Sequence, residues 1–168
     1  MPQFVIAGLR PDRWLVYPAI KDLPPGQLQA DVFRDFRVQG NELSVFEPSA
    51  TVSPERIAIA VAAGRETLDR HGTSHTLFDR AGVEARSIPI RKTPGQTPDD
   101  AVNALHYDLI VGTAANLLAL AEVISQGSKV APILPKGVET LLKSGIQNGQ
   151  LDAQRIPKRL RETLGIKV

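Results

Sequence analysis

The chain has 168 residues, of which 42% are hydrophobic, 23% charged and 5% aromatic, and it has no cysteine. This composition suits one folded domain with a small helical appendage and argues against wholesale disorder. The lack of cysteine excludes disulfides, thiolate metal sites and a cysteine nucleophile. We expect a cytoplasmic protein without membrane contact, because the N-terminal residues lack the pattern of a signal peptide and no run approaches the roughly 18 apolar residues of a membrane span.

The net charge of +2 is unevenly distributed along the chain. From residue 129 onward there are eight Lys or Arg against three acidic residues, a formal charge of +5, which leaves −3 for residues 1–128. We therefore divide the chain into an α+β part, 1–128, and a basic helical C-terminal segment, 129–168, that packs on the same domain. The basic segment either attracts a polyanion or forms a solvated helix face that complements the acidic body.

The first half of the chain predicts strands separated by short helices. Apolar and β-branched residues indicate strands at 3–9 and 14–20, and alternation indicates a half-buried strand at 42–46. Residues 30–38 suit one or two helical turns. Ser53 followed by Pro54 is a typical helix start, and we expect that helix to continue to about residue 69.

The second half contains the most apolar part of the sequence, residues 108–125. It reads as a short buried strand at 109–111, a turn at Gly112, and a helix at 114–125 capped by Thr113. The residues around Gly82 suggest a turn, 99–105 a short helix, and 137–146 an amphipathic helix. A last helix is expected after Asp152, with its regular part starting only at Pro157 if the proline interrupts it. The fold class is α+β, a small mixed sheet packed with helices plus a C-terminal helical hairpin.

Two histidines four residues apart, His71 and His75, have the spacing of paired metal ligands on a helix. Gly72 and its polar neighbours favour a loop instead. We therefore predict no metal site and no cofactor.

His106 and Asp108 are the candidate catalytic residues. They lie where a short helix leads into the central strand, and a histidine near a carboxylate is able to act as a general base. The alternative is structural, with Asp108 bonded to amides of the adjacent turn.

Candidate binding residues occur at two places. Arg10, Arg13 and Trp14 bring two guanidiniums and an indole together, a combination that recognises phosphates, carboxylates or a partner surface, although a lone tryptophan also suits a core. The second set is the basic C-terminal residues, which suit a phosphate backbone: Arg155, Lys158, Arg159 and Arg161. A helix-turn-helix match is poor, because the connection between the last two helices is too long.

Known phosphate-binding and hydrolase motifs are missing from the sequence, including GxGxxG, GxxxxGK[ST], GxSxG and HExxH. We therefore expect a non-enzymatic module that binds a partner protein or self-assembles. One alternative is a nucleic-acid-binding protein that uses the basic helices. The other is an enzyme acting on a nucleotide-like or phosphorylated substrate, with His106, Asp108, Arg10 and Arg13 in one cleft.

Overall fold

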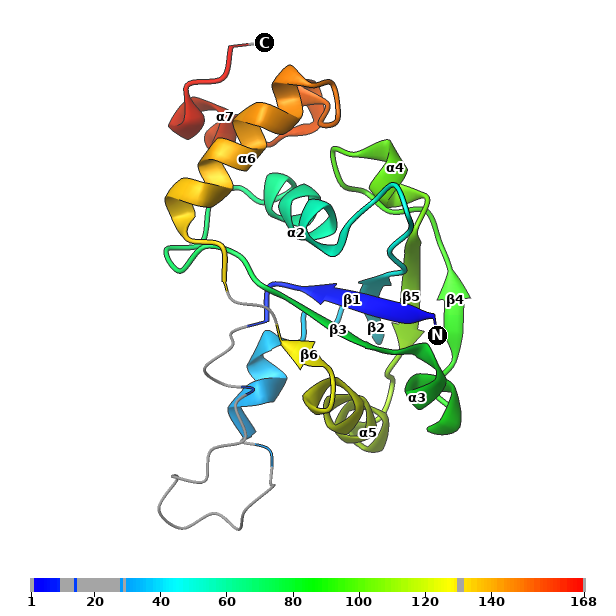
Figure 1. The fold of residues 1–168 in the computed structure, drawn as a ribbon. Coiled ribbons are helices and arrows are strands. Elements are labelled where there is room, and N and C mark those ends of the chain that lie inside the picture. Colours follow the sequence, from blue (N-terminus) through cyan, green and yellow to red (C-terminus); the bar gives the residue numbers. More distant parts are fainter. Residues whose placement is uncertain (1, 10–13, 15–27, 29, 130–131, 168) are drawn as a thin grey trace.

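The computed structural model describes residues 2–9, 14, 28, 30–129 and 132–167. Within this part of the chain, six strands form one sheet in the order β4-β5-β2-β1-β3-β6 (Figure 1). The strands are β1 (Gln3–Ala7), β2 (Glu42–Phe46), β3 (His75–Asp79), β4 (Ile90–Lys92), β5 (His106–Ile110) and β6 (Ser128–Lys129). The helices are η1 (Ala30–Asp35), α2 (Pro54–Ala63), α3 (Arg80–Ala85), α4 (Asp100–Asn103), α5 (Ala114–Ser125), α6 (Pro135–Gln147), η2 (Ala153–Arg155) and α7 (Lys158–Leu164). The predicted α+β class is confirmed.

Every pairing in this sheet is antiparallel, whereas the sequence suggested a mixed sheet. β2 and β3 run in the same direction, but β1 lies between them and is antiparallel to both. Helix α2, which connects β2 to β3, lies on the face above β1 (Figure 1). Strands that share a direction are therefore kept apart by a strand of the opposite direction, an arrangement that local sequence patterns do not reveal.

The sheet has a hydrophobic core on each face, because side chains alternate between the faces along a strand. On β1, Phe4 and Ile6 belong to the core under α3 and α5, whereas Val5 belongs to the core under α2. On β2, Leu43 and Val45 point to the α5 side and Phe46 to the α2 side. The protein is thus three-layered, with helices on both faces of the sheet (Figure 1).

Local capping accounts for the start of two helices. The Ser53 hydroxyl accepts a hydrogen bond from the amide of Arg56, and Thr113 does the same for Asn116. Helix α2 ends at Ala63 with Gly64 as its cap, several residues before the predicted end, since glycine is a poor helix former.

The turn expected around Gly82 is wrong, because Gly82 lies inside α3. A Cβ on this residue would meet a methyl group of Val123 on α5 at 3.0 Å. Gly82 therefore allows α3 and α5 to approach closely, and tertiary packing overrides its low helix propensity.

The C-terminal helices pack on the body through α2. Val138 and Leu142 of α6 and Leu160 of α7 are buried in the same core as Ile57 of α2. Asp152 caps only the short η2, and the regular helix α7 begins after Pro157. Among the described residues, no helix has both the length and the apolar character needed to cross a bilayer.

Candidate ligand-binding site

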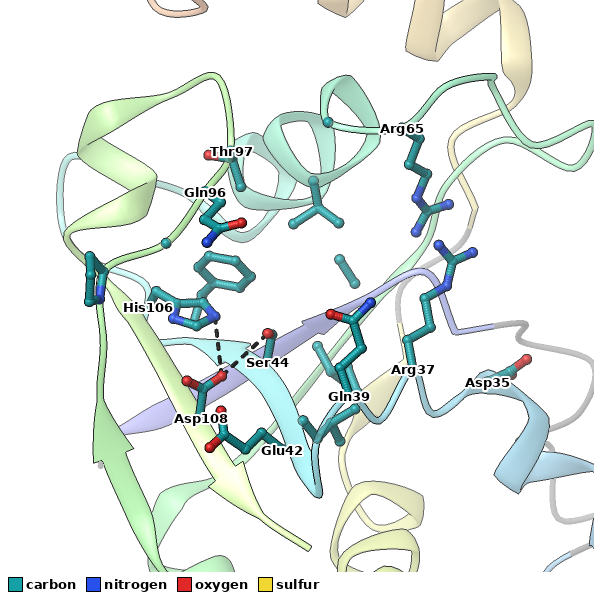
Figure 2. Close-up of a pocket in the computed structure, with 18 residues that line it drawn as sticks. Asp35, Arg37, Gln39, Glu42, Ser44, Arg65, Gln96, Thr97, His106 and Asp108 are labelled. Carbon is teal, nitrogen blue, oxygen red and sulfur yellow. Dashed lines mark hydrogen bonds and ion pairs between the residues drawn. The ribbon is translucent and has the colours of Figure 1, made fainter. Parts of the chain in front are cut away.

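A pocket of about 440 Å³ opens over the centre of the sheet, on the face that carries α2. We call it the β2–β5 pocket. Side chains of β2 and β5 form its floor, residues 94–97 form one wall, and Arg37, Gln39 and Arg65 line the opposite side (Figure 2). Volumes of this size are typical of small-molecule sites.

The pocket exists because two central strands carry polar side chains where a core would have apolar ones. Ser44 of β2 lies opposite Asp108 of β5, and Phe46 lies opposite His106. The other face of the same strands bears apolar residues such as Val45 and Leu109. The polar positions thus leave a hollow on this face of the sheet instead of a packed core.

Hydroxyl groups hold the carboxylate of Asp108 on the pocket floor. Thr93 donates to Asp108 Oδ2 over 2.6 Å, and Ser44 donates to Oδ1 over 3.4 Å. Thr93 Oγ1 also lies 2.9 Å from Nδ1 of His106. With a hydrogen on Nδ1, His106 donates to Thr93 and Thr93 donates to Asp108, so the three side chains form one directed chain of hydrogen bonds.

The order of these contacts differs from that of a serine nucleophile with its base. In a Ser–His–Asp site, the histidine lies between the other two groups and bonds to both. Here Asp108 lies between Ser44 and His106, with Oδ1 at 3.6 Å from His106 Nε2. The arrangement presents polar groups suited to holding a ligand, and the role of His106 as a general base stays a prediction.

Two guanidiniums point toward one another at the far end of the pocket from His106 and Asp108 (Figure 2). Arg37 follows η1 and is exposed, whereas Arg65 follows the end of α2 and is half-buried. The buried Nε of Arg65 has no hydrogen-bond partner in the described chain, and Asp35 also lines the pocket on this side (Figure 2).

Burial lowers the pKa of Arg65 from its ordinary value, and the positive charge of Arg37 lowers it further. The charge of Asp69 raises this pKa and offsets part of the effect. Arginine remains protonated at neutral pH, so this end of the pocket holds two positive charges that repel each other, and the carboxylate of Asp35 lines the pocket near them. An anion bound between them would stabilise both.

Asn103 fixes the pocket wall at Thr97. Its Oδ1 accepts from the amide of Thr97 over 2.7 Å and from the Thr97 hydroxyl over 2.9 Å, and its Nδ2 donates to the Thr97 carbonyl over 2.9 Å. Arg155 also donates to this carbonyl, so the C-terminal segment contacts the same wall.

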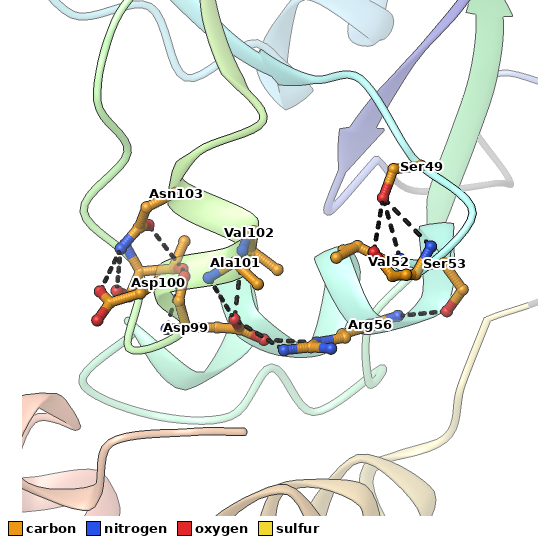
Figure 3. Close-up of polar contacts among 11 residues, drawn as sticks. Ser49, Val52, Ser53, Arg56, Asp99, Asp100, Ala101, Val102 and Asn103 are labelled. Atoms are coloured by element: carbon orange, nitrogen blue, oxygen red, sulfur yellow. Dashed lines mark hydrogen bonds and ion pairs between the residues drawn. The ribbon is translucent and has the colours of Figure 1, made fainter. Parts of the chain in front are cut away.

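A buried ion pair joins this wall to α2 through α4 (Figure 3). Arg56 donates to Asp99 through Nε at 2.7 Å and through Nη2 at 3.0 Å. Asp99 also accepts from the amides of Ala101 and Val102 and thereby caps α4. All of these bonds satisfy a carboxylate whose side chain is 1% exposed, so Asp99 has a structural role.

Of the sequence candidates near the N-terminus, the structure describes only Trp14, which does not line this pocket. Arg10 and Arg13 lie outside the described residues. Trp14 is buried against Phe36, and its indole donates to Asp35 over 2.9 Å. The indole therefore fills core space, and its ring is not presented on the surface.

The four basic C-terminal candidates have different surroundings. Arg155 pairs with Asp100, and Lys158 lies 3.8 Å from Glu162. Arg159 is exposed, whereas Arg161 is half-buried with no hydrogen-bond partner for its Nε in the described chain. Among the described residues, carboxylates thus pair with Arg155 and Lys158.

The two histidines spaced four residues apart differ in burial. His71 is exposed in a turn, and His75 is buried in β3. In the part of the chain that the structure describes, no three histidine, aspartate or glutamate side chains are placed to hold a metal ion.

Sequence reasoning named His106 and Asp108, which line the pocket, but missed Ser44, Arg37 and Arg65. The polar residue in the apolar alternation of 42–46 was an available signal for Ser44. No local pattern marks the two arginines.

The chain was compared with protein-family models, with curated proteins and with solved structures, and none of the three comparisons finds a match.

Proposed function

We propose that this protein binds a small anionic metabolite in the β2–β5 pocket. The observation that carries the proposal is the convergence of Arg37 and Arg65 on a cavity whose floor bears Ser44 and Asp108. Small-molecule sites typically combine a preformed cavity with a few polar groups that fix the orientation of the ligand.

The charges of the pocket support one orientation of the ligand. An anionic group belongs at the arginine end, because the Asp35 carboxylate on that side already accepts a hydrogen bond from the Trp14 indole, whereas the carboxylates of Asp108 and Glu42 line the opposite end and repel the anion. Guanidinium groups bind carboxylates and phosphates through paired hydrogen bonds. The other end of the ligand then meets hydroxyl, carboxylate and imidazole groups.

A thermal-shift screen of anionic metabolites tests the proposal, because a ligand that binds only the folded state raises Tm. We expect at least one compound to stabilise the natural chain and the Arg159→Gln control but not Arg65→Gln. Arg159 is a suitable control because it is exposed on α7 and does not line the pocket. If no anion stabilises the chain, or if Arg65→Gln responds like the control, the proposal is wrong.

A second candidate function is the partner-binding or self-assembling module expected from the sequence, in a cytoplasmic setting that suits a cysteine-free chain. It is favoured by exposed apolar side chains on two elements, Phe33 of η1 (37% exposed) and Leu118 of α5 (49%). Light scattering of the natural chain and of Leu118→Ser tests self-association. If the natural chain has the molecular mass of an oligomer and the variant has the mass of a single chain, self-association through α5 is supported. The nucleic-acid alternative has less support, because Arg155 and Lys158 are matched by carboxylates of the same chain.

A further inference from the structure

We propose that the ligand of the β2–β5 pocket is a phosphate monoester of a polyol, as in a sugar phosphate. Its phosphate lies between Arg37 and Arg65, and its hydroxyl groups bind Asp108 and Ser44. This inference rests on the proposed function of the pocket as a site for small anions.

The presence of two guanidiniums, those of Arg37 and Arg65, at one end of the pocket favours phosphate over carboxylate, since the Asp35 carboxylate on that side is bonded to the Trp14 indole. A phosphate monoester carries a charge of about −1.5 to −2 at neutral pH and three acceptor oxygens, which allows two guanidiniums to bind it together. A carboxylate has one negative charge and two oxygens, which a single guanidinium already satisfies. Because Arg37 and Arg65 repel each other, a dianion between them removes more unfavourable energy than a monoanion does.

The opposite end suits hydroxyl groups. Ionised Asp108 is purely an acceptor with about four lone-pair sites, and Thr93 and Ser44 use only two of them. The Ser44 side chain is exposed to the pocket, and the amide of Gln96 lies above the same floor (Figure 2). Hydroxyl groups both donate and accept, so a polyol matches this mixture of acceptor and donor groups.

The Asp108 end of the pocket contains a second carboxylate. Glu42 lines the pocket on the Asp108 side, and Arg91 pairs with it there. This pairing occupies Glu42 and leaves the carboxylate of Asp108 as an acceptor for the ligand. The phosphate and the hydroxyl groups are therefore assigned to opposite ends.

Isothermal titration of the full chain with matched compounds tests this assignment. One set is glucose 6-phosphate, glucose 6-sulfate, glucuronate and glucose, and the second is glycerol 3-phosphate, glycerate and glycerol, with inorganic phosphate as a reference. Glucose 6-sulfate is the sharpest comparison, because it keeps the tetrahedral shape and has one negative charge. We expect at least one phosphate ester to bind 10-fold or more tightly than its sulfate, carboxylate and neutral counterparts.

Matched variants assign the two ends of the ligand. Arg37→Gln and Arg65→Gln each weaken the ester about 10- to 100-fold, the range for losing a charged hydrogen bond. Asp108→Asn weakens the ester and leaves the affinity for inorganic phosphate unchanged. Arg159→Gln and Asp79→Asn, at exposed positions that do not line the pocket, leave both affinities unchanged. Circular dichroism and Tm of every variant identify any that fail to fold.

Three results would overturn the inference. If glucuronate or the sulfate binds as tightly as the phosphate and still depends on Arg65, the pocket takes anions but is not selective for phosphate, and the proposed function stands. If inorganic phosphate binds as tightly as every ester and Asp108→Asn changes nothing, the polyol half is wrong. If no phosphate ester binds, the inference fails, and the thermal-shift screen of other anions decides separately whether the proposed function fails with it.

Discussion

The guanidinium of Arg65 lies against the backbone of Gly8, where any Cβ would overlap its Nη2 atom. Gly8 has φ +84°, a left-handed conformation that side chains rarely adopt. The residue just after β1 thus provides the space in which the arginine at the end of α2 reaches the β2–β5 pocket. Two segments far apart in sequence depend on each other at this point.

The substitution Gly8→Ala is expected to displace Arg65 and to cost about 1–2 kcal/mol in the free energy of unfolding, because alanine is strained in the left-handed region. Gly149→Ala is the matched control, since Gly149 has φ +68° with nothing within 4 Å of an added Cβ. Both variants should lose similar stability in urea unfolding. Only Gly8→Ala should also weaken anion binding, and equal binding by the two variants would contradict this role of Gly8.

Removing Arg56 should lower the free energy of unfolding by about 3 kcal/mol, because it breaks a buried ion pair. This value is the lower end of the range for such pairs, since the Arg56 side chain is 26% exposed. The Asp99 side chain, 1% exposed, would keep its charge without its cation. Urea unfolding of Arg56→Ala measures this loss. Lys143→Ala, which removes an exposed pair with Glu139 on α6, should change stability by no more than about 0.5 kcal/mol. Equal losses in both variants would show that the buried pair contributes no more than a surface pair.

His75 should make the protein sensitive to acid. Burial lowers the pKa of His75 below its ordinary 6.5, and the charge of Glu55 partly opposes this. The unfolded chain therefore takes up a proton on His75 at a higher pH than the folded chain does. Stability from this group is fully present above pH 6.5 and decreases as the pH falls below it.

Unfolding free energies of the natural chain and of His75→Leu, measured from pH 8 to pH 5, check this expectation. The natural chain should lose more stability than the variant as the pH falls. Glu55→Gln should increase the loss, because it removes the charge that favours protonated His75 in the folded state. Parallel pH profiles of all three proteins would be the contrary result.

Asn103→Ala should loosen the pocket wall, because it removes three hydrogen bonds to Thr97. We expect faster hydrogen exchange of the Thr97 amide and weaker binding of any ligand of the pocket. Asn148→Ala is the control: Asn148 follows α6, and the change removes one exposed hydrogen bond, to the hydroxyl of Ser144. It should change neither measurement. Unchanged exchange at Thr97 in Asn103→Ala would mean that other contacts hold the wall.

Local signals predicted the elements that begin with a strong cap or a clear alternation. Ser53 and Thr113 cap α2 and α5 as expected, and strand Glu42–Phe46 and helix Ala114–Ser125 have the predicted ends. Caps and periodicity act between residues within a few positions of each other, so sequence is sufficient for them. The prediction at Gly82 was wrong because the close approach of α5, a tertiary contact, decides its conformation.

The sequence by itself determined the α+β class, the apolar α5 helix, and the choice of His106 and Asp108 as candidate residues, although it placed the strand at 109–111 whereas β5 spans His106–Ile110 and contains both. Only the tertiary structure decided that Ser44 lies opposite Asp108, and that Arg37 and Arg65 meet at the other end of the same pocket. The physical reason is that strand register and the packing of α2 on the sheet place these side chains, and both depend on contacts between segments distant in sequence.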